Sequence, residues 1–262
     1  MTDATQTLHD PIDPARARAL QATLGETPTL GTGDTLPPFF HQIYFWDPQV
    51  PADLGRDGHP KLGGVIPDMG LPRRMWAGGQ LEFHAPFRAG KPATRRTTLE
   101  KAEHKQGRSG PLAFVTLRHE IWQDETCCIA EHQDLVYRED ETGQKPEPPR
   151  APDGAGKTRT VSFDSTLLFR YSALTFNGHR IHYDEGYARQ VEGYDGLVVH
   201  GPLLAHHLMQ MADAELGGLK RFSFRATSPL MHHEVAEICW GKDGACWVRG
   251  PDGRQCMSAK AG

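Results

Sequence analysis

The chain has 262 residues, enough for one large domain or two of ordinary size. Its formal net charge of −4 at pH 7 favours neither nucleic acid nor an anionic membrane surface as a partner. The 5 cysteines are odd in number and form no CxxC pair, which favours a reduced protein over a disulfide framework.

The first quarter of the chain predicts little regular structure. It has no apolar run of a secretory signal, and no window approaches the roughly 18 apolar residues of a membrane span, so we expect a cytoplasmic protein. Residues 11–24 predict a short amphipathic helix, with Ala17 and Leu20 on its apolar side. Residues 49–79 are rich in glycine and proline and predict a long loop, which inside a compact domain is usually a binding feature or a lid.

A set of strands follows this loop. Alternating or β-rich runs predict strands over residues 80–87, 93–105, 112–123 and 127–139, with a hairpin turn at 104–110. Next comes a charged segment rich in proline and glycine, which predicts a linker. We therefore expect one domain over residues 1–140, a linker over 141–160 and a second domain over 161–262.

The second half contains the clearest helix of the chain. A strand at 161–164 and a helix at 165–175 precede the stretch "DGLVVHGPLLAHHLMQMADAELGG", in which Pro202 suits a first helical turn and Gly217 ends the helix. Short antiparallel strands are expected after it. The start of this strand set, "FSFRATSPL", faintly resembles "LEFHAPF" in the first half, which predicts a duplicated sheet unit with the long helix in the second copy alone.

The stretch "RYSALTFNGHRIHYDEGYA" gathers titratable side chains beside an Asn-Gly turn. His179, His182 and Asp184 suit acid–base catalysis, metal binding or a purely structural turn. The spacing lacks the ligands four apart and the glutamate of HExxH, so we expect no metal. From this stretch alone, a structural turn is supported as well as catalysis.

The start of the long helix adds a second kind of group. A helix N-terminus offers unpaired N–H groups and the positive end of the helix dipole. Because Pro202 has no N–H, Gly201, Leu203 and Leu204 are the candidate donors. Such donors stabilise a carbonyl oxygen as it gains negative charge, so this helix start and the histidines together suit enolate chemistry.

"FRYSALTFNGHRIHYD" followed by "EGYDGLVVHGPLLAHHLM" resembles the MaoC-like dehydratases of the type-2 enoyl-CoA hydratase superfamily. The resemblance is greatest to the long members, which are mesaconyl-CoA and itaconyl-CoA hydratases and mitochondrial-type 3-hydroxyacyl-thioester dehydratases. "WAGGQLEFHAPFRAGKPATRRTTLE" resembles their non-catalytic half. The resemblance implies an α+β double hot-dog fold, in which two antiparallel sheets each wrap a helix and the N-terminal copy is degenerate.

The group's motif is Asp, any residue, Asn, Pro, an aliphatic residue and His. Lined up on the last position, His182 is the catalytic histidine, His179 replaces the Asn and Asn177 replaces the catalytic Asp. An amide cannot take a proton from water at neutral pH. The resemblance thus leaves Asn177 to orient the water and His182 to carry the proton, with His179 or Asp184 as candidate assistants. Gly201 matches the glycine whose N–H polarises the thioester carbonyl.

The implied reaction is the reversible hydration of a 2-enoyl-CoA to a 3-hydroxyacyl-CoA by a hydro-lyase without a cofactor, acting as a monomer or homodimer. A branched dicarboxylic acyl group, such as mesaconyl-C4 or itaconyl, needs an extra cation, for which Arg73, Arg74 and Arg180 are candidates. Arg95 and Arg96 are candidates for CoA phosphates. The alternatives are a 3-hydroxyacyl-ACP dehydratase, a non-catalytic acyl-thioester-binding protein, a thioesterase and, less favoured, a metal-dependent hydrolase.

Overall fold

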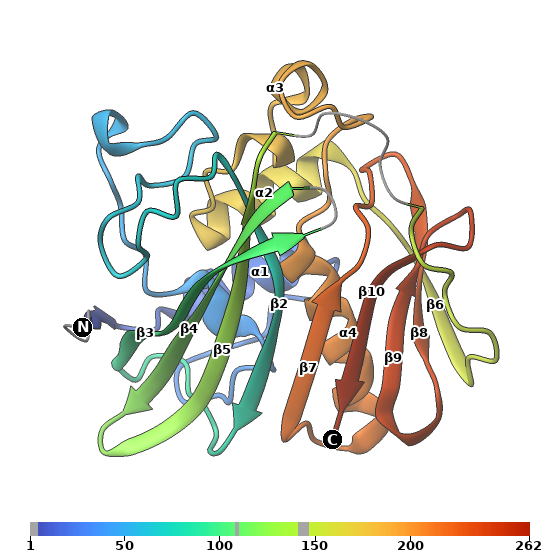
Figure 1. The fold of residues 1–262 in the computed structure, drawn as a ribbon. Helices are drawn as coiled ribbons and strands as arrows, with labels where there is room; N and C mark the ends of the chain where they lie inside the picture. Colours follow the sequence, from blue (N-terminus) through green and yellow to red (C-terminus); the bar gives the residue numbers. More distant parts are fainter. Residues whose placement is uncertain (1–4, 108–109, 141–146) are drawn as a thin grey trace.

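The strands of the protein form one continuous antiparallel sheet. The computed structural model describes residues 5–107, 110–140 and 147–262, which contribute ten strands in the order β1-β3-β4-β5-β2-β7-β10-β9-β8-β6. Helices pack against one face of the sheet, and α4 runs along the strands of the second half (Figure 1). The α+β class is as predicted, but the two expected sheets join edge to edge through β2 and β7.

The first half supplies five strands and little helix. Its strands are β1 (Thr5–Asp10), β2 (Arg73–Phe83), β3 (Ala93–Gly107), β4 (Gly110–Gln123) and β5 (Thr126–Arg138). Between β1 and β2 lie α1 (Pro14–Thr23) and the 3-10 helices η1 (Phe40–Ile43) and η2 (Pro51–Asp53). The predicted helix at 11–24 and all four predicted strands are present in the structure. In β4, alternate residues are buried, as the sequence pattern requires.

Both ends of the strand predicted at 80–87 were placed wrongly, because β2 also ends earlier, at Phe83. Residues 73–79 were expected to be loop because of their glycines, yet they belong to β2. Those glycines are required by the sheet: a Cβ on Gly78 would lie 2.5 Å from the Phe224 carbonyl oxygen of β7. Close backbone approach, rather than a turn, explains why β2 has so loop-like a sequence.

The second half contains the longer helices. Its elements are β6 (Lys157–Ser162), α2 (Ser165–Thr175), η3 (Arg180–His182), α3 (Glu185–Gln190), α4 (Gly201–Leu216), β7 (Arg221–Ala226), β8 (Val235–Trp240), η4 (Lys242–Gly244), β9 (Ala245–Arg249) and β10 (Gln255–Ala261). The helices at 165–175 and after Pro202 are confirmed. Asp164 caps α2 through the Leu167 N–H, and Gly217 ends α4 in the left-handed conformation.

The predicted linker is shorter than expected. Lys157–Thr160 were assigned to it but lie in β6, an edge strand paired with β8 alone and mostly exposed. Exposure on both faces removes the apolar alternation that would have marked a strand. Residues 141–146 of the linker and 108–109 of the predicted hairpin turn lie outside the described residues. The division into domains stays a prediction.

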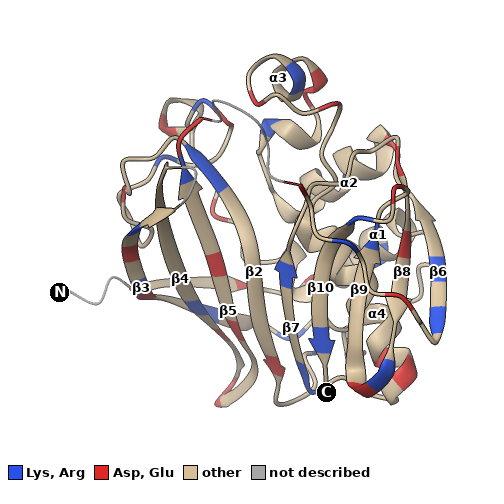
Figure 2. Ribbon diagram, turned by 45° about the vertical axis from the view of Figure 1, so that its right-hand side comes forward, with Lys and Arg blue, Asp and Glu red and all other residues tan. Residues whose placement is uncertain are grey.

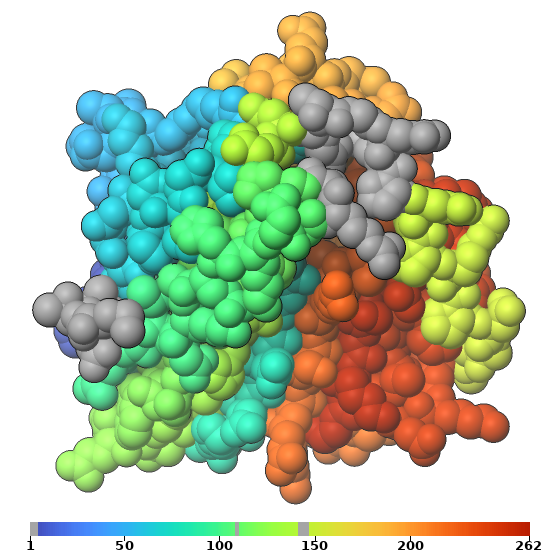
Figure 3. Space-filling view, in the orientation of Figure 1, coloured from blue at the N-terminus to red at the C-terminus, as the bar shows by residue number. Residues whose placement is uncertain are grey.

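The two halves are related by an approximate internal symmetry. Taken from each outer edge toward the centre, the order β1-β3-β4-β5-β2 is matched by β6-β8-β9-β10-β7. The two segments whose sequences resemble each other, in β2 and β7, pair at the centre with Leu81 opposite Phe222. Figure 3 shows the N-terminal half, in blue to green, beside the C-terminal half in orange and red. This strand order supports the predicted duplication.

The long helix lies in the core. The residues of α4 from Leu203 to Met209 are all buried, and its main strand neighbours are β8, β9 and β10. Covering on every side explains its largely apolar sequence. Among the described residues no helix is both long and apolar enough to cross a membrane.

Candidate active site

The histidine segment is held in place by backbone contacts. Helix α2 ends at Phe176, in the left-handed conformation, and the Asn177 side-chain oxygen then accepts a hydrogen bond from the His179 N–H at 3.0 Å. The chain continues into η3, where the Ile181 carbonyl accepts from the Val198 N–H at 2.9 Å. The Asn-Gly turn is therefore structural, and it presents His179 and His182 from a short, fixed element.

His182 is fixed as a neutral base. Its Nδ1 lies 2.7 Å from the Val198 carbonyl oxygen, which only accepts, so Nδ1 carries the proton and Nε2 carries the lone pair. Burial holds the pKa of His182 well below its usual value, and the nearby His200 and His179 lower it further. At neutral pH the ring is therefore an uncharged imidazole, and its basic nitrogen, Nε2, is not used by the hydrogen bond to Val198.

The ring of His200 packs against one face of the His182 ring. The two rings stack with centroids 3.7 Å apart and planes 20° apart. The His200 Nε2 bonds to the Ser172 hydroxyl at 2.8 Å, and burial lowers the pKa of His200 to about 3. Stacking on a neutral, hydrogen-bonded neighbour restricts the rotation of His182.

The start of α4 leaves one N–H group available. The Leu203 and Leu204 N–H groups both donate to the His200 carbonyl, at 3.0 and 3.2 Å, so the expectation that they serve as external donors is wrong. The first turn of the helix closes on its own N-cap carbonyl, which uses them. Pro202 has no N–H. Within the described ranges, no group accepts a hydrogen bond from the Gly201 N–H.

A cavity of about 950 Å³ lies between the two halves of the molecule. It brings together most of the residues predicted for the site. From the second half it is lined by Asn177, His179, His182 and Gly201, together with Tyr171, and from the first half by His59, Arg73, Arg74 and Trp76. A helix N–H and a basic imidazole thus face one enclosed space, which is wide enough for a small ligand.

The loop before β2 is clamped onto the histidine segment by two glycines. A Cβ on Gly58 would lie 2.1 Å from the Gly178 carbonyl oxygen, and one on Gly178 would lie 2.4 Å from that of Gly58. The Arg180 N–H also donates to the Asp57 carbonyl at 2.9 Å. This contact places the His59 and His179 rings 4.5 Å apart, centroid to centroid. The loop, which was predicted to be a binding feature or a lid, contributes His59 to the lining of the cavity.

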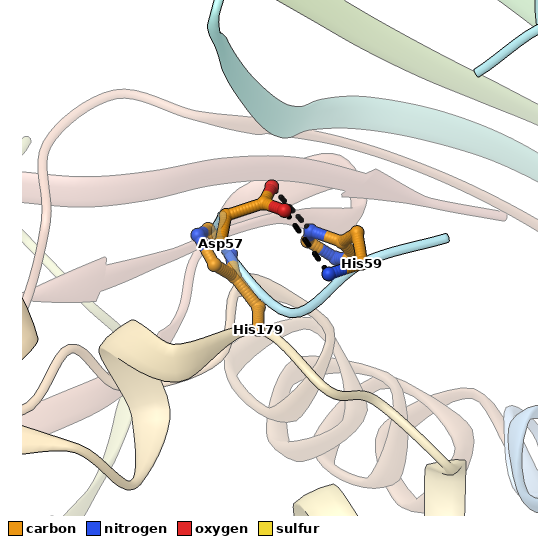
Figure 4. A group of neighbouring side chains, drawn as sticks. All are labelled: Asp57, His59 and His179. Atoms are coloured by element: carbon orange, nitrogen blue, oxygen red, sulfur yellow. Dashed lines mark hydrogen bonds and ion pairs between the residues drawn. The ribbon is translucent and has the colours of Figure 1, made fainter. Parts of the chain in front are cut away.

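Asp57 and His59 form a hydrogen-bonded pair beside His179 (Figure 4). The Asp57 carboxylate accepts from His59 Nδ1 at 2.9 Å and from the His59 backbone N–H at 3.0 Å. Burial alone would raise the pKa of Asp57, but these hydrogen bonds and the nearby imidazole hold it below its usual value. Burial, with Arg74 nearby, lowers the pKa of His59 to about 3.

The same three residues are the one group among the described residues that is arranged as a metal site. One ligand atom from each of Asp57, His59 and His179 lies within 4.8 Å of the others. Two imidazoles and a carboxylate would suit zinc. In the structure both oxygens of Asp57 already accept hydrogen bonds from His59, which is the arrangement of an acid–base pair.

A buried ion pair joins the halves at the other side of the cavity. Arg73 of β2 donates to Glu192 at 2.8 Å, and both side chains are buried. Glu192 also accepts from the Tyr187 hydroxyl at 3.2 Å and lies 3.7 Å from His179 Nε2. Burial would raise the pKa of Glu192, but His179 and Arg73 hold it below its usual value. The carboxylate is therefore ionised and fully engaged.

The sequence of residues 39–232 matches the family model for hydroxyacyl-thioester dehydratase type 2. The chain belongs to this family. A mesaconyl-C(4)-CoA hydratase of Chloroflexus aurantiacus is 45% identical over 262 residues, covering 97% of this chain and 94% of the relative.

Solved structures of the same architecture extend the comparison. HtdX of Mycobacterium tuberculosis aligns with a TM-score of 0.69 over 98% of both chains, at 20% identity. A second protein of that organism, described as a double hotdog fold, aligns with a TM-score of 0.61 over 100% of this chain and 96% of its own, at 12% identity. The predicted double hot-dog fold is confirmed by these structures and by the duplicated strand order.

Four residues predicted for the site of this dehydratase-family protein do not line the cavity. Arg180 is paired with Asp184, with its NH2 2.7 Å from a carboxylate oxygen, and Asp184 caps α3 through the Tyr187 N–H. Arg95 packs against Phe45 inside the first half. Arg96 is exposed on β3. The Arg180–Asp184 pair has a structural role, which its spacing of four residues could have suggested.

Sequence reasoning missed three contributors to the site. His59 and Asp57 lay in a segment without periodicity, and the two-residue spacing of an acidic residue and a histidine was the available signal. His200 directly precedes Gly201 at the helix start, so its position beside the site could have been expected. Its stacking on His182 could not, since that depends on the path of residues 183–199.

Proposed function

We propose that this protein catalyses the reversible hydration of a 2-enoyl-CoA to a 3-hydroxyacyl-CoA, and that its substrate is mesaconyl-C4-CoA (3-methylfumaryl-CoA) or a similar branched dicarboxylic acyl-CoA such as itaconyl-CoA. The relative of 45% identity, matched over nearly the full length of both chains, supports the acyl group. The family match supports the class of reaction. CoA is part of the substrate, and the proposed reaction needs no separate cofactor.

The observation that carries the proposal is the pairing of His182 with Gly201 on one cavity. With the thioester bound there, the Gly201 N–H donates to the carbonyl oxygen. His182 Nε2 takes one proton from water as the water oxygen bonds to the β-carbon, and the electron pair of the double bond moves toward the thioester oxygen. The enolate then takes that proton from His182 at the α-carbon, which completes the addition of water.

Arg74 is the favoured partner for the second carboxylate of the substrate. It lines the cavity, and no ion pair to it is recorded among the described residues. Arg73 lines the same cavity, but Glu192 already neutralises it. A second carboxylate near the upper end of β2, a central strand of the sheet with basic residues at that end (Figure 2), would be attracted by Arg74.

A panel of thioesters tests this proposal. Crotonyl-, mesaconyl-C1-, mesaconyl-C4- and itaconyl-CoA are incubated with the enzyme while the absorbance of the conjugated double bond is followed. We expect the largest kcat/KM for mesaconyl-C4-CoA. Release of free thiol without hydration would instead identify a thioesterase, binding without turnover would identify an acyl-thioester-binding protein, and turnover of the acyl-carrier-protein thioester alone would identify an ACP dehydratase.

A further inference from the structure

The site as described lacks a second strong acceptor for the attacking water. His182 Nε2 accepts one of the two hydrogens of that water. Where the resemblance placed a carboxylate the chain has Asn177, whose side-chain oxygen accepts the His179 N–H of its own turn at 3.0 Å. One of the two lone pairs of that oxygen is therefore used inside the turn, and the amide nitrogen is a donor. An amide oxygen is also a weaker acceptor than a carboxylate, so a strong second acceptor for the water has to come from elsewhere.

His59 lies on the cavity with its basic nitrogen unused. Its Nδ1 carries the proton because it donates to the ionised Asp57 carboxylate at 2.9 Å, so Nε2 has the lone pair. No hydrogen bond from any described residue reaches Nε2. The ring lines the same cavity as His182 and Asn177, and His179 lies between the two histidines, with ring centroids 4.5 Å from His59 and 5.4 Å from His182.

We propose that His59, positioned by Asp57, is a second catalytic residue, whose Nε2 accepts a hydrogen bond from the water that adds to the β-carbon. This inference rests on the proposed hydratase function. The non-catalytic half of the duplicated fold thereby supplies the strong acceptor that the amide at position 177 cannot. The Gly58–Gly178 contact is what brings it there.

The step balances without any further reactant. One hydrogen of the water passes to His182 Nε2 and then to the α-carbon, and the oxygen bonds to the β-carbon. The other hydrogen stays on that oxygen as the new hydroxyl group and is held by His59 Nε2. This hydrogen bond orients the water oxygen toward the β-carbon while His182 takes the other hydrogen, so that C–O bond formation and proton transfer can occur together.

Replacing His59 and restoring a carboxylate at position 177 test the inference. We expect His59→Ala to lower kcat for enoyl-CoA hydration by about 10²-fold with little change in KM, since a preorganised hydrogen bond is lost. Asp57→Asn is expected to lower kcat less and to leave KM unchanged, because Asp57 acts only through His59. In the double variant His59→Ala/Asn177→Asp, a carboxylate accepts the same hydrogen, and we expect kcat to recover by at least about tenfold.

The control is His84→Ala. His84 is half-exposed and paired with Glu82 at 3.5 Å, away from the cavity, so the variant should keep the wild-type kcat. Retained kcat in His59→Ala, or no recovery in the double variant, overturns the inference while wild-type turnover keeps the proposed function intact. Stoichiometric zinc in the purified protein, with turnover lost to a chelator, would overturn it in favour of a metal centre at Asp57, His59 and His179. Wild-type protein that hydrates no enoyl-CoA would refute the proposed function itself.

Discussion

The two halves of the sheet share a strand order but differ in what lies between their first two strands. In the second half this connection contains α2, α3 and the buried helix α4, whose first N–H group opens onto the cavity. In the first half it contains α1, two short 3-10 helices and a long loop that reaches across to the histidine segment. The second half thus contributes the helix start to the cavity, and the first half contributes side chains to it.

Buried polar groups show the same division. In the first half, Glu131 accepts from His41 at 2.9 Å and from Gln42, inside the core. The neighbouring histidine in β4, His119, bonds to Thr97 and Gln133. In the second half, His182 and Gly201 each leave one polar group facing the cavity. A buried histidine therefore points to catalysis only where a nitrogen without a protein partner also faces the cavity. His41 Nδ1 and both nitrogens of His206 lack a partner within the described structure, but these residues do not line it.

The largest effect on stability is expected at the ion pair that joins the halves. Arg73→Met leaves Glu192 charged and buried without its cation, which should lower the free energy of unfolding by about 3–5 kcal/mol. Chemical denaturation measures this. The matched control is Arg189→Met, which breaks exposed pairs with Glu185 and Asp195 and should lower the free energy of unfolding far less. Equal losses in the two variants would refute the structural role of Arg73.

The second largest effect on stability is expected at the contact between Gly58 and Gly178, which also joins the halves. Gly58 has φ +87°, and an added Cβ would clash with Gly178, so Gly58→Ala should cost about 2–5 kcal/mol and reduce hydration activity. Gly33→Ala is the matched control, since Gly33 has φ +90° but open space around it. It should cost only about 1–2 kcal/mol, from backbone strain. Thermal unfolding and kcat are measured for both variants. If the two variants lose stability and activity to the same extent, the contact between Gly58 and Gly178 has no role in joining the halves.

The preference between two substrates tests the part of the cavity that the first half supplies. Arg74→Met should lower kcat/KM for mesaconyl-C4-CoA about 10–10²-fold more than for crotonyl-CoA, because only the former has a second carboxylate. Steady-state kinetics on both substrates measure the ratio. A variant that loses activity on both to the same extent would place the carboxylate elsewhere.

The smallest expected effect is a change in pH dependence. Burial lowers the pKa of His206 in α4 to about 3, and neither of its ring nitrogens has a partner within the described structure. Its folded-state pKa lies below the unfolded value of about 6.5, so its contribution to stability is complete above about pH 6.5 and is lost as the pH falls. Between about pH 6 and 4, the unfolded chain binds one more proton at this position than the folded one.

His206→Leu should remove that dependence. Denaturation at several pH values measures how steeply the free energy of unfolding falls as the pH decreases. This fall should be about 1.4 kcal/mol per pH unit smaller in the variant than in the wild type. A slope that stays the same in His206→Leu would mean that this histidine is not held neutral.

Local patterns in the sequence were enough to predict most of the elements. Strand β4 alternates cleanly, and Gly217 marked the end of α4. Prediction failed where a tertiary contact sets the residue type. The glycines of β2 suit strand packing and were interpreted as loop, and β6 is exposed on both faces.

The candidate site divides in the same way. Asn177, His179, His182 and Gly201 lie together on the cavity because they flank one short segment and one helix start. Asp57 and His59 were not predicted, since more than a hundred residues separate them from His179. Backbone contacts join the two segments, between Gly58 and Gly178 and between the Arg180 N–H and the Asp57 carbonyl. Long-range contact through glycine leaves no periodic signal in the sequence.

The central claim is that the neutral imidazole of His182 transfers the proton in an enoyl-CoA hydratase. The kcat for mesaconyl-C4-CoA hydration in His182→Gln, compared with wild type and with His206→Gln, tests it most directly. We predict a loss of about 10²–10⁴-fold in the first variant, with KM nearly unchanged, and a loss below about tenfold in the second, whose histidine does not line the cavity. A His182→Gln enzyme that keeps the wild-type kcat would contradict the account.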